Sequence, residues 1–173
     1  ALPQALASDG QLYGVPMQSA IKTAMGYMIR QDWLDDLGLD VPETIDDWYE
    51  VLTAFKTNDV NGQGVGSVTP LVLDKAWENY YYNFADAWGI ELNPNNDFWL
   101  TREDTVEYAP LLDESKEFIT TMAQWYAEGL IDTDFVTRED TNNYHVLNDL
   151  AGSTLYWTGY IAGMNNDPGV LEN

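Results

Sequence analysis

The sequence predicts a single α/β domain that is predominantly helical, with short strands near its two ends. Apolar residues recur at three- and four-residue steps through the middle of the chain, which is typical of amphipathic helices. Short runs rich in β-branched and aromatic residues occur at residues 11–17, 24–29 and 153–158, which is typical of strands. The length of 173 residues fits one domain of ordinary size.

Local signals place the first helices. Residues 31–37 form a short predicted helix, which Gly38 ends. Thr44 and Asp47 have the spacing of a capping box at the start of a second helix. The apolar face expected for that helix consists of Ile45, Trp48, Leu52 and Phe55. Residues 58–66 are rich in glycine and asparagine and are predicted to form a loop.

Aromatic residues mark the elements of the second half. Within residues 74–88, one helical stripe is formed by Trp77, Tyr81, Phe84 and Trp88. Residues 98–100 and 105–108 flank a polar turn and predict a hairpin. A long helix over 111–128 is expected to bury Phe118, Ile119, Met122, Trp125 and Tyr126, and a shorter helix is predicted over 140–150. At helical spacing, Trp48, Trp88, Phe118 and Trp125 are best interpreted as core.

The charge of the chain restricts its partners. The sequence has 29 Asp and Glu against 7 Lys and Arg, for a formal net charge of -22. Such a field repels a phosphate backbone, so we expect no nucleic-acid partner. Anionic membrane surfaces are disfavoured for the same reason. Cysteine is absent, which excludes disulfides, thiolate metal sites and cysteine nucleophiles.

Five segments, in order along the chain, carry a resemblance to a known family. They are residues 9–16, 29–39, 42–49, 126–135 and 151–159. The first is similar to the family motif D-G-K-x-Y-G-x-P, the second to R-K-D-W-L-D-K-L-G-L and the fourth to Y-x-E-G-L-I-D-P-D-F. Together they resemble the extracellular solute-binding proteins of type 1, which are the carbohydrate-binding lipoproteins of ABC importers.

The resemblance implies a fold and a function. The fold is one lobe of a type II periplasmic binding protein, here residues 1–173, with hinge-crossing strands near residues 11–29 and 153–160. The function is binding of an extracellular solute, a mono- or oligosaccharide, between two lobes for delivery to an ABC permease in the membrane. The resemblance also implies a cell-surface lipoprotein, with signal and anchor outside this fragment, and a protein that is not an enzyme.

Candidate sugar contacts lie where predicted elements end. Sugars are bound by aromatic faces together with carboxylate, amide and hydroxyl groups in an otherwise dry site. The resemblance points to Trp77 as a stacking platform and Asp74 as an acceptor, although Asp74 could simply cap a helix and Trp77 pack inward. It also points to Tyr160, with Trp157 in reserve, because ligands of open α/β sheets favour the carboxyl ends of strands. Gln18 could bond a ligand hydroxyl or lie in a solvated loop.

A possible metal loop lies between the second helix and the residues after it. Asp59, Asn61 and Gln63 place oxygens at positions 1, 3 and 5, with Gly64 at position 6, as in an EF-hand loop that binds calcium. Pro70 stands at position 12, where an EF-hand has its bidentate glutamate. The alternative is a glycine-rich turn that has lost its metal. No other cofactor is expected.

Other functions remain as alternatives. The single histidine, His145, has no catalytic partner suggested by the sequence, and no nucleophile-elbow, zinc-helix or phosphate-loop motif occurs. One alternative is an accessory domain of a carbohydrate-active enzyme, which would need a positioned pair of carboxylates. Another is a helical interaction domain without a small ligand. A receptor for a non-sugar solute, such as a peptide or a polyol, also stays open.

Overall fold

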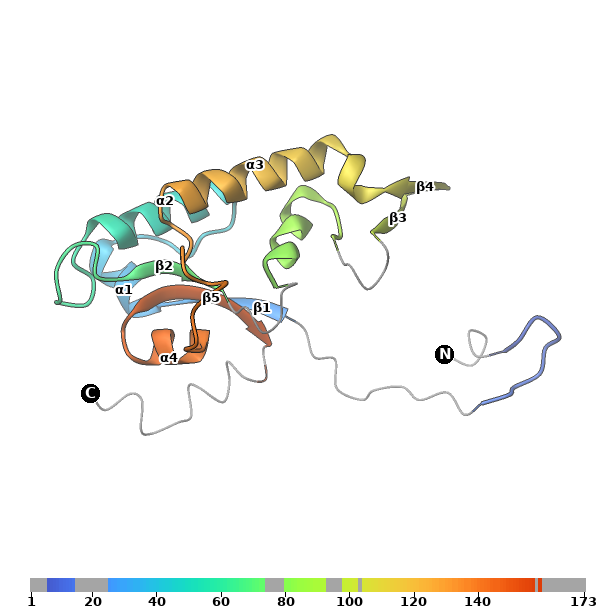
Figure 1. The fold of residues 1–173 in the computed structure, drawn as a ribbon, viewed down its shortest axis with the longest axis horizontal. Helices are drawn as coiled ribbons and strands as arrows, with labels where there is room; N and C mark the ends of the chain where they lie inside the picture. Colours follow the sequence, from blue (N-terminus) through green and yellow to red (C-terminus); the bar gives the residue numbers. More distant parts are fainter. Residues whose placement is uncertain are drawn as a thin grey trace.

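The computed structural model describes residues 6–14, 25–73, 80–92, 98–102, 104–157 and 159 (Figure 1). The elements in chain order are β1 (Met25–Ile29), α1 (Gln31–Leu37), α2 (Ile45–Thr57), β2 (Thr69–Val72), the 3-10 helix η3 (Tyr80–Trp88), β3 (Trp99–Arg102), β4 (Thr105–Tyr108), the 3-10 turn η5 (Ala109–Leu111), α3 (Asp113–Ala127), α4 (Asn142–Leu147) and β5 (Ala151–Trp157). Helices and two small sheets are therefore both present in the described part of the chain.

The main sheet is built around the last described strand. Its order is β1-β5-β2, with β5 antiparallel to β1 and parallel to β2. Ile131 extends the sheet by a parallel bridge to Leu71. Two buried hydroxyls of β5 reinforce the parallel pair, because Ser153 donates to the Pro70 carbonyl at 2.7 Å and Thr154 donates to the Val72 carbonyl at 2.9 Å.

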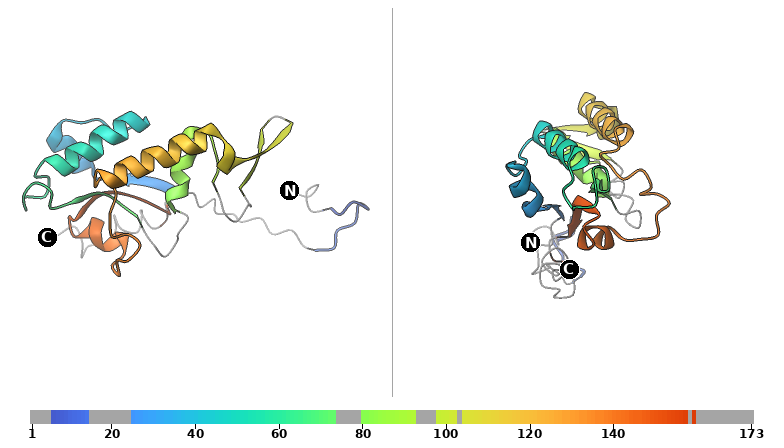
Figure 2. Two further views of the ribbon diagram at one scale, coloured as in Figure 1. Left: turned by 45° about the horizontal axis from the view of Figure 1, so that its top comes forward. Right: turned by 90° about the vertical axis from the view of Figure 1, so that its left-hand side faces the viewer.

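Helices cover both faces of this sheet. Figure 2 shows α2 and α3 on one side and α4 on the other. The larger core cluster joins α2, β2, η3, α3 and β5 through Leu52, Leu71, Phe84, Trp125 and Leu155. A second cluster joins α1 to α2, and a third, on the α4 side, consists of Val72, Val146 and Ala151. The expected core aromatics Trp48, Phe118 and Trp125 are all buried, and Trp88 packs against the same cluster.

The start of α2 confirms the predicted capping box. The Thr44 hydroxyl accepts a hydrogen bond from the Asp47 amide at 3.1 Å, and the Asp47 carboxylate accepts one from the Thr44 amide at 2.9 Å. These bonds satisfy amides that have no partner within the helix. They also lower the pKa of Asp47 from its ordinary value, with the bond from Thr44 as the largest cause.

Several predictions need correction. Residues 11–14 are described without a strand, so the strand predicted over 11–17 is wrong there, and the rest of that segment lies outside the described residues. β2 was not predicted, because it is only four residues long and contains Pro70. On α3, Ile119 and Tyr126 are exposed, since the buried face consists of Ser115, Phe118, Met122 and Trp125.

The helix predicted over 74–88 also differs from the structure in the part that is described. Its described part is the 3-10 helix η3. Phe84 in η3 is buried, whereas Trp77 lies outside the described residues. The predicted hairpin is confirmed as the antiparallel pair β3-β4, in which Trp99 faces Tyr108 at a ring-centroid distance of 5.1 Å.

Close packing between β5 and the helices generates a stability prediction. A Cβ atom at position 152 would lie 2.7 Å from Phe55 Cε2 and 3.1 Å from Trp33 Cζ3. We expect Gly152→Ala to lower the free energy of unfolding by about 1–3 kcal/mol, because buried rings must move to admit the methyl group. Denaturant unfolding measures this loss.

A double variant separates this contact from other effects. Phe55→Leu removes ring atoms next to position 152, so Gly152→Ala should cost less in that background than in the wild type. Gly14→Ala is the control, since no atom lies within 4 Å of a Cβ built there. Additive losses in the double variant would contradict the close contact.

Candidate functional site

Three chain segments meet at one edge of the main sheet. β2 and β5 are parallel, so both end at this edge. β1 is antiparallel to β5 and begins there, with Met25 opposite Trp157. The ends of β2 and β5 and the start of β1 therefore lie at the same side of the sheet. In open α/β sheets, ligands bind in crevices outside such carboxyl ends.

The predicted sugar contacts belong to these three segments. Trp157 is the last residue of β5, and it is partly buried against the larger core cluster. Gln18, Asp74, Trp77 and Tyr160 lie outside the described residues. The roles of the four residues stay predictions.

Tyr27 is an aromatic residue near this edge that the sequence analysis did not single out. It lies on β1 opposite Leu155, with 44 % of its surface exposed. Its ring centroid is 4.6 Å from that of Phe84 and 5.5 Å from that of Trp48. Partial burial and the Asp86 carboxylate raise the pKa of Tyr27 to about 12. The phenol therefore stays protonated at neutral pH and can both donate and accept hydrogen bonds.

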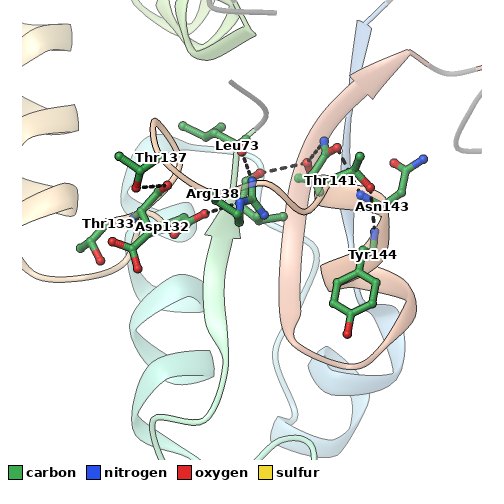
Figure 3. Close-up of polar contacts among 12 residues, drawn as sticks. Leu73, Asp132, Thr133, Thr137, Arg138, Thr141, Asn143 and Tyr144 are labelled. Carbon is green, nitrogen blue, oxygen red and sulfur yellow. Dashed lines mark hydrogen bonds and ion pairs between the residues drawn. The ribbon is translucent and has the colours of Figure 1, made fainter. Parts of the chain in front are cut away.

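The same edge contains a buried ion pair. Arg138 Nε lies 3.1 Å from Asp132 Oδ2, and the two side chains are 8 % and 10 % exposed. Arg138 Nη2 donates a hydrogen bond to the carbonyl of Leu73, the residue that follows β2 (Figure 3). The main chain of Asp132 is bound to the same strand, because its amide donates to the Leu71 carbonyl at 3.0 Å. Leu73 directly precedes the segment that carries Asp74 and Trp77.

A second polar contact joins α4 to the middle of β5 and the end of β2. Asn142, the first residue of α4, is fully buried, and its amide donates to the Thr154 hydroxyl at 2.9 Å. Thr154 in turn donates to the Val72 carbonyl. The helix itself is capped by the Thr141 hydroxyl, which accepts from the Tyr144 amide at 3.2 Å. These contacts fix the last residue of β2 from the side opposite α2.

His145 lies in α4 beside this network. Burial lowers the pKa of its imidazole below the ordinary value, and the positive charge of Arg138 lowers it further, while Asp132 and Asp140 act in the opposite direction. Its Nε2 atom is buried without a hydrogen-bond partner among the described residues. Its ring contacts Tyr144 edge-on at 5.8 Å. The histidine is therefore held neutral at physiological pH next to a buried arginine.

The predicted calcium loop is closed by its own hydrogen bonds. Asp59 Oδ1 accepts from the Gly64 amide at 2.8 Å, and Asn61 Oδ1 accepts from the Gln63 amide at 3.0 Å and the Ser67 hydroxyl at 2.8 Å. Asn61 Nδ2 donates to the Asp149 carbonyl at 2.9 Å. The side chain of Asn61 thus joins the loop to the turn before β5.

The residues of this loop fit a calcium ion poorly. Calcium takes six to eight oxygen ligands, of which several are carboxylates. The loop supplies one carboxylate, from Asp59, and its twelfth position is Pro70 within β2. Among the described residues, no three acidic, histidine or cysteine side chains are grouped to hold a metal. Both alternatives, a calcium site and a turn without a metal, stay predictions.

Other structural features limit the possible functions. Across the described ranges, no helix is long and apolar enough to cross a membrane. The arginines with described partners are neutralised locally, since Arg30 pairs with Asp32 and Arg102 with Glu114. The candidate site defined so far is the edge of a small mixed sheet at which β2 and β5 end and β1 begins.

Comparison with known proteins assigns the family. The profile of the bacterial extracellular solute-binding proteins matches residues 1–170, and the chain belongs to this family. It is 32% identical to Lipoprotein LipO of Bacillus subtilis (strain 168) over 142 residues, which cover 76% of this chain and 26% of LipO. It is also 32% identical over 149 residues to the fructooligosaccharide ABC transporter substrate-binding protein FusA of Streptococcus pneumoniae, covering 80% of this chain and 27% of FusA.

A solved structure agrees with this assignment. The HMO-binding, ABC-transporter-associated solute-binding protein of Bifidobacterium longum infantis superposes with a TM-score of 0.73 at 28% identity, over 90% of this chain and 35% of that protein. The fold is therefore consistent with that of the solute-binding proteins, as the resemblance implied, while the predicted predominance of helix stays a prediction. The chain spans about a quarter of the length of the two curated relatives.

The loop contacts predict independence from calcium. We expect neither calcium nor EDTA to change the melting temperature. Asn61→Ala should lower the free energy of unfolding by about 1–2 kcal/mol, with calcium and with EDTA alike, because hydrogen bonds to Asp149 and Ser67 are lost. Asn58→Ala is the control, since the Asn58 amide bonds only to the carbonyl of Ala54 in its own helix. A rise in melting temperature on adding calcium would contradict the prediction and restore the calcium site.

The environment of His145 predicts a pH dependence of stability. Its pKa is lower in the folded protein than in the unfolded chain, so the unfolded chain takes up a proton first as the pH falls. The stability should therefore decrease as the pH drops through about 6.5. The melting temperature of the wild type should fall more between pH 7.5 and 5.5 than that of His145→Gln. Equal falls would show that His145 does not contribute.

Proposed function

We propose that this chain forms part of a receptor that binds a sugar outside the cell and delivers it to an ABC permease. The observation that carries the proposal is that β2 and β5 end, and β1 begins, at one edge of the sheet in a chain of the solute-binding family. The names of two relatives support a sugar, because one is a fructooligosaccharide-binding protein and one an HMO-binding protein. The name of LipO supports a lipoprotein at the cell surface.

The binding step is a selection between open and closed states. This chain supplies one half of the contacts, and a second lobe of the full-length protein supplies the other. The ligand stabilises the closed state by the contacts that exist only there. No bond of the solute is broken in this cycle, so the protein acts as a receptor and not as an enzyme. The permease recognises the closed form.

The charge of the chain favours a neutral sugar. The net charge of -22 repels anionic solutes at long range. Arg30, Arg102 and Arg138 are each paired with a carboxylate, so they do not offer a charge to an acidic sugar. Neutral hydroxyls instead require stacking faces and hydrogen-bond acceptors, which Trp77, Tyr160 and Asp74 would supply.

A thermal-shift screen with the full-length protein tests the proposal. Neutral oligosaccharides, including a fructooligosaccharide, are compared with a polyol, a peptide and polygalacturonate. A ligand at a hundred times its dissociation constant adds about 2.7 kcal/mol to the stability. We expect this shift with a neutral sugar only. A shift with the peptide or the polyol, or cleavage of the sugar, would overturn the proposal.

Variants then test the predicted contacts by calorimetry. Trp77→Ala and Asp74→Asn should each raise the dissociation constant by about tenfold or more, because a stacking face or a charged acceptor is worth about 1–3 kcal/mol. Trp99→Ala is the matched control, because Trp99 is an exposed tryptophan on the separate β3-β4 hairpin. Unchanged affinity in Trp77→Ala would remove that residue from the site.

A further inference from the structure

The loop after α2 contains an asparagine that is followed by a glycine. Asn61 and Gly62 form the one Asn-Gly pair in the sequence. The main-chain nitrogen that follows an asparagine can attack the side-chain Cγ of that asparagine, and glycine hinders this attack least because it has no Cβ. Gly62 is exposed and has a positive φ of 74°. The pair is therefore a candidate site of chemical modification.

The reaction is deamidation, and it requires no reactant other than water. The Gly62 nitrogen forms a bond to Asn61 Cγ, and the bond between Cγ and Nδ2 breaks. The proton of the Gly62 nitrogen goes to the departing Nδ2 group, which leaves as ammonia. Water then adds to either carbonyl carbon of the resulting cyclic imide and opens it to aspartate or isoaspartate. Nothing is oxidised or reduced, and a side-chain amide is replaced by a carboxylate.

Three hydrogen bonds hold the Asn61 amide in its native position. Its Oδ1 accepts from the Gln63 amide at 3.0 Å and from the Ser67 hydroxyl at 2.8 Å. Its Nδ2 donates to the Asp149 carbonyl at 2.9 Å. Ring closure rotates the amide out of this position and releases Nδ2. Because hydrogen bonds weaken steeply with distance and angle, the native contacts oppose the reaction.

The loop can open while the rest of the domain stays folded. Val60 and Val68 pack in the core cluster of α1 and α2 and anchor the two ends of the loop. Between them, residues 61–67 are exposed or partly exposed, and the bonds of Asn61 to Gln63 and Ser67 are exposed to solvent. Such loops open at a lower free energy than a core does. Since deamidation is slow, its rate follows the population of the open loop.

We propose that Asn61 is a site of spontaneous deamidation, that its three side-chain bonds shield it until the loop opens, and that the reaction releases the loop from the turn before β5. The turn contains Asp149, which has a positive φ of 56°. This conformation is uncommon for a residue other than glycine, so it depends on the contacts around it. A carboxylate at position 61 has no proton to donate to the Asp149 carbonyl at neutral pH, and two acceptors then face each other.

The first test measures the rate of the reaction in the full-length protein. The folded protein and the protein unfolded in denaturant are incubated in mildly alkaline buffer, and peptide mapping by mass spectrometry follows the product at Asn61. We expect Ser67→Ala to react about twofold to tenfold faster than the wild type, because one hydrogen bond fewer holds the loop closed. Thr57→Ala is the matched control and should react at the wild-type rate, since the Thr57 hydroxyl donates to the Thr53 carbonyl in its own helix.

Either of two results would overturn the shielding. One is an equal rate in the folded wild type and in the unfolded chain, and the other is an equal rate in the wild type and in Ser67→Ala. The modification site itself would be overturned if neither folded protein contained the product at Asn61 after the unfolded chain had reacted fully.

The second test measures the consequence of the reaction. Asn61→Asp contains the carboxylate of one product. Asn58→Asp is the matched control, because it adds the same charge while Asn58 bonds to the Ala54 carbonyl in its own helix. The Thr69 amide donates to the Leu150 carbonyl, so its hydrogen exchange reports on the turn. We expect this amide to exchange severalfold faster in Asn61→Asp than in the wild type, and at the wild-type rate in Asn58→Asp. An unchanged rate in Asn61→Asp would overturn the release of the loop.

Discussion

The position of β5 at the centre of the main sheet is the constraint on which the rest of the structure depends. β5 is formed by residues 151–157, yet its neighbours β1 and β2 come from the first half of the chain. All three strands, and the helices between them, must be in place before the sheet is complete. Gly152 admits the rings of Phe55 and Trp33 against this strand, so the packing of α1 and α2 also requires it.

The same topology places the site. A parallel neighbour and an antiparallel neighbour put two strand ends and one strand start at a single edge. Segments that are far apart in the sequence thus become adjacent without any contact of their own. The acidic surface can then vary with little effect on the site, because the edge is defined by backbone pairing and by buried side chains.

Local signals made much of the fold predictable. The capping box of Thr44 and Asp47, Gly38 after α1 and the β3-β4 hairpin each depend on neighbours within a few residues, and the structure confirms them. β2 could not be found in this way, because a four-residue strand containing Pro70 has no clear period. Its existence follows from pairing with β5, about 80 residues later in the chain.

The limits of prediction at the site have a similar cause. The resemblance points to Asp74 and Trp77, although both lie outside its five matching segments. Asp132 lies in the fourth segment, yet neither residue type nor spacing indicates that it is buried with Arg138 and that the guanidinium reaches Leu73. The calcium pattern is the opposite case, in which the sequence gives a signal and the structure adds contacts that the sequence does not indicate. The spacing of Asp59, Asn61 and Gln63 resembles a metal loop, while the contacts of Asn61 close it onto Asp149.

The two polar contacts at the end of β2 also bear on how a lobe can prepare half of a binding site. A receptor that closes on its ligand gains affinity only from contacts that are better in the closed state than in the open one. If the groups that meet a ligand were free to take several arrangements, part of that gain would be lost in ordering them. Apolar packing would stabilise the edge but would tolerate small rotations of the chain. Hydrogen bonds to consecutive carbonyls do not, because they weaken steeply with angle. The hydrogen bonds of Thr154 and Arg138 therefore fix the direction of the Val72 and Leu73 carbonyls more strictly than apolar contacts would.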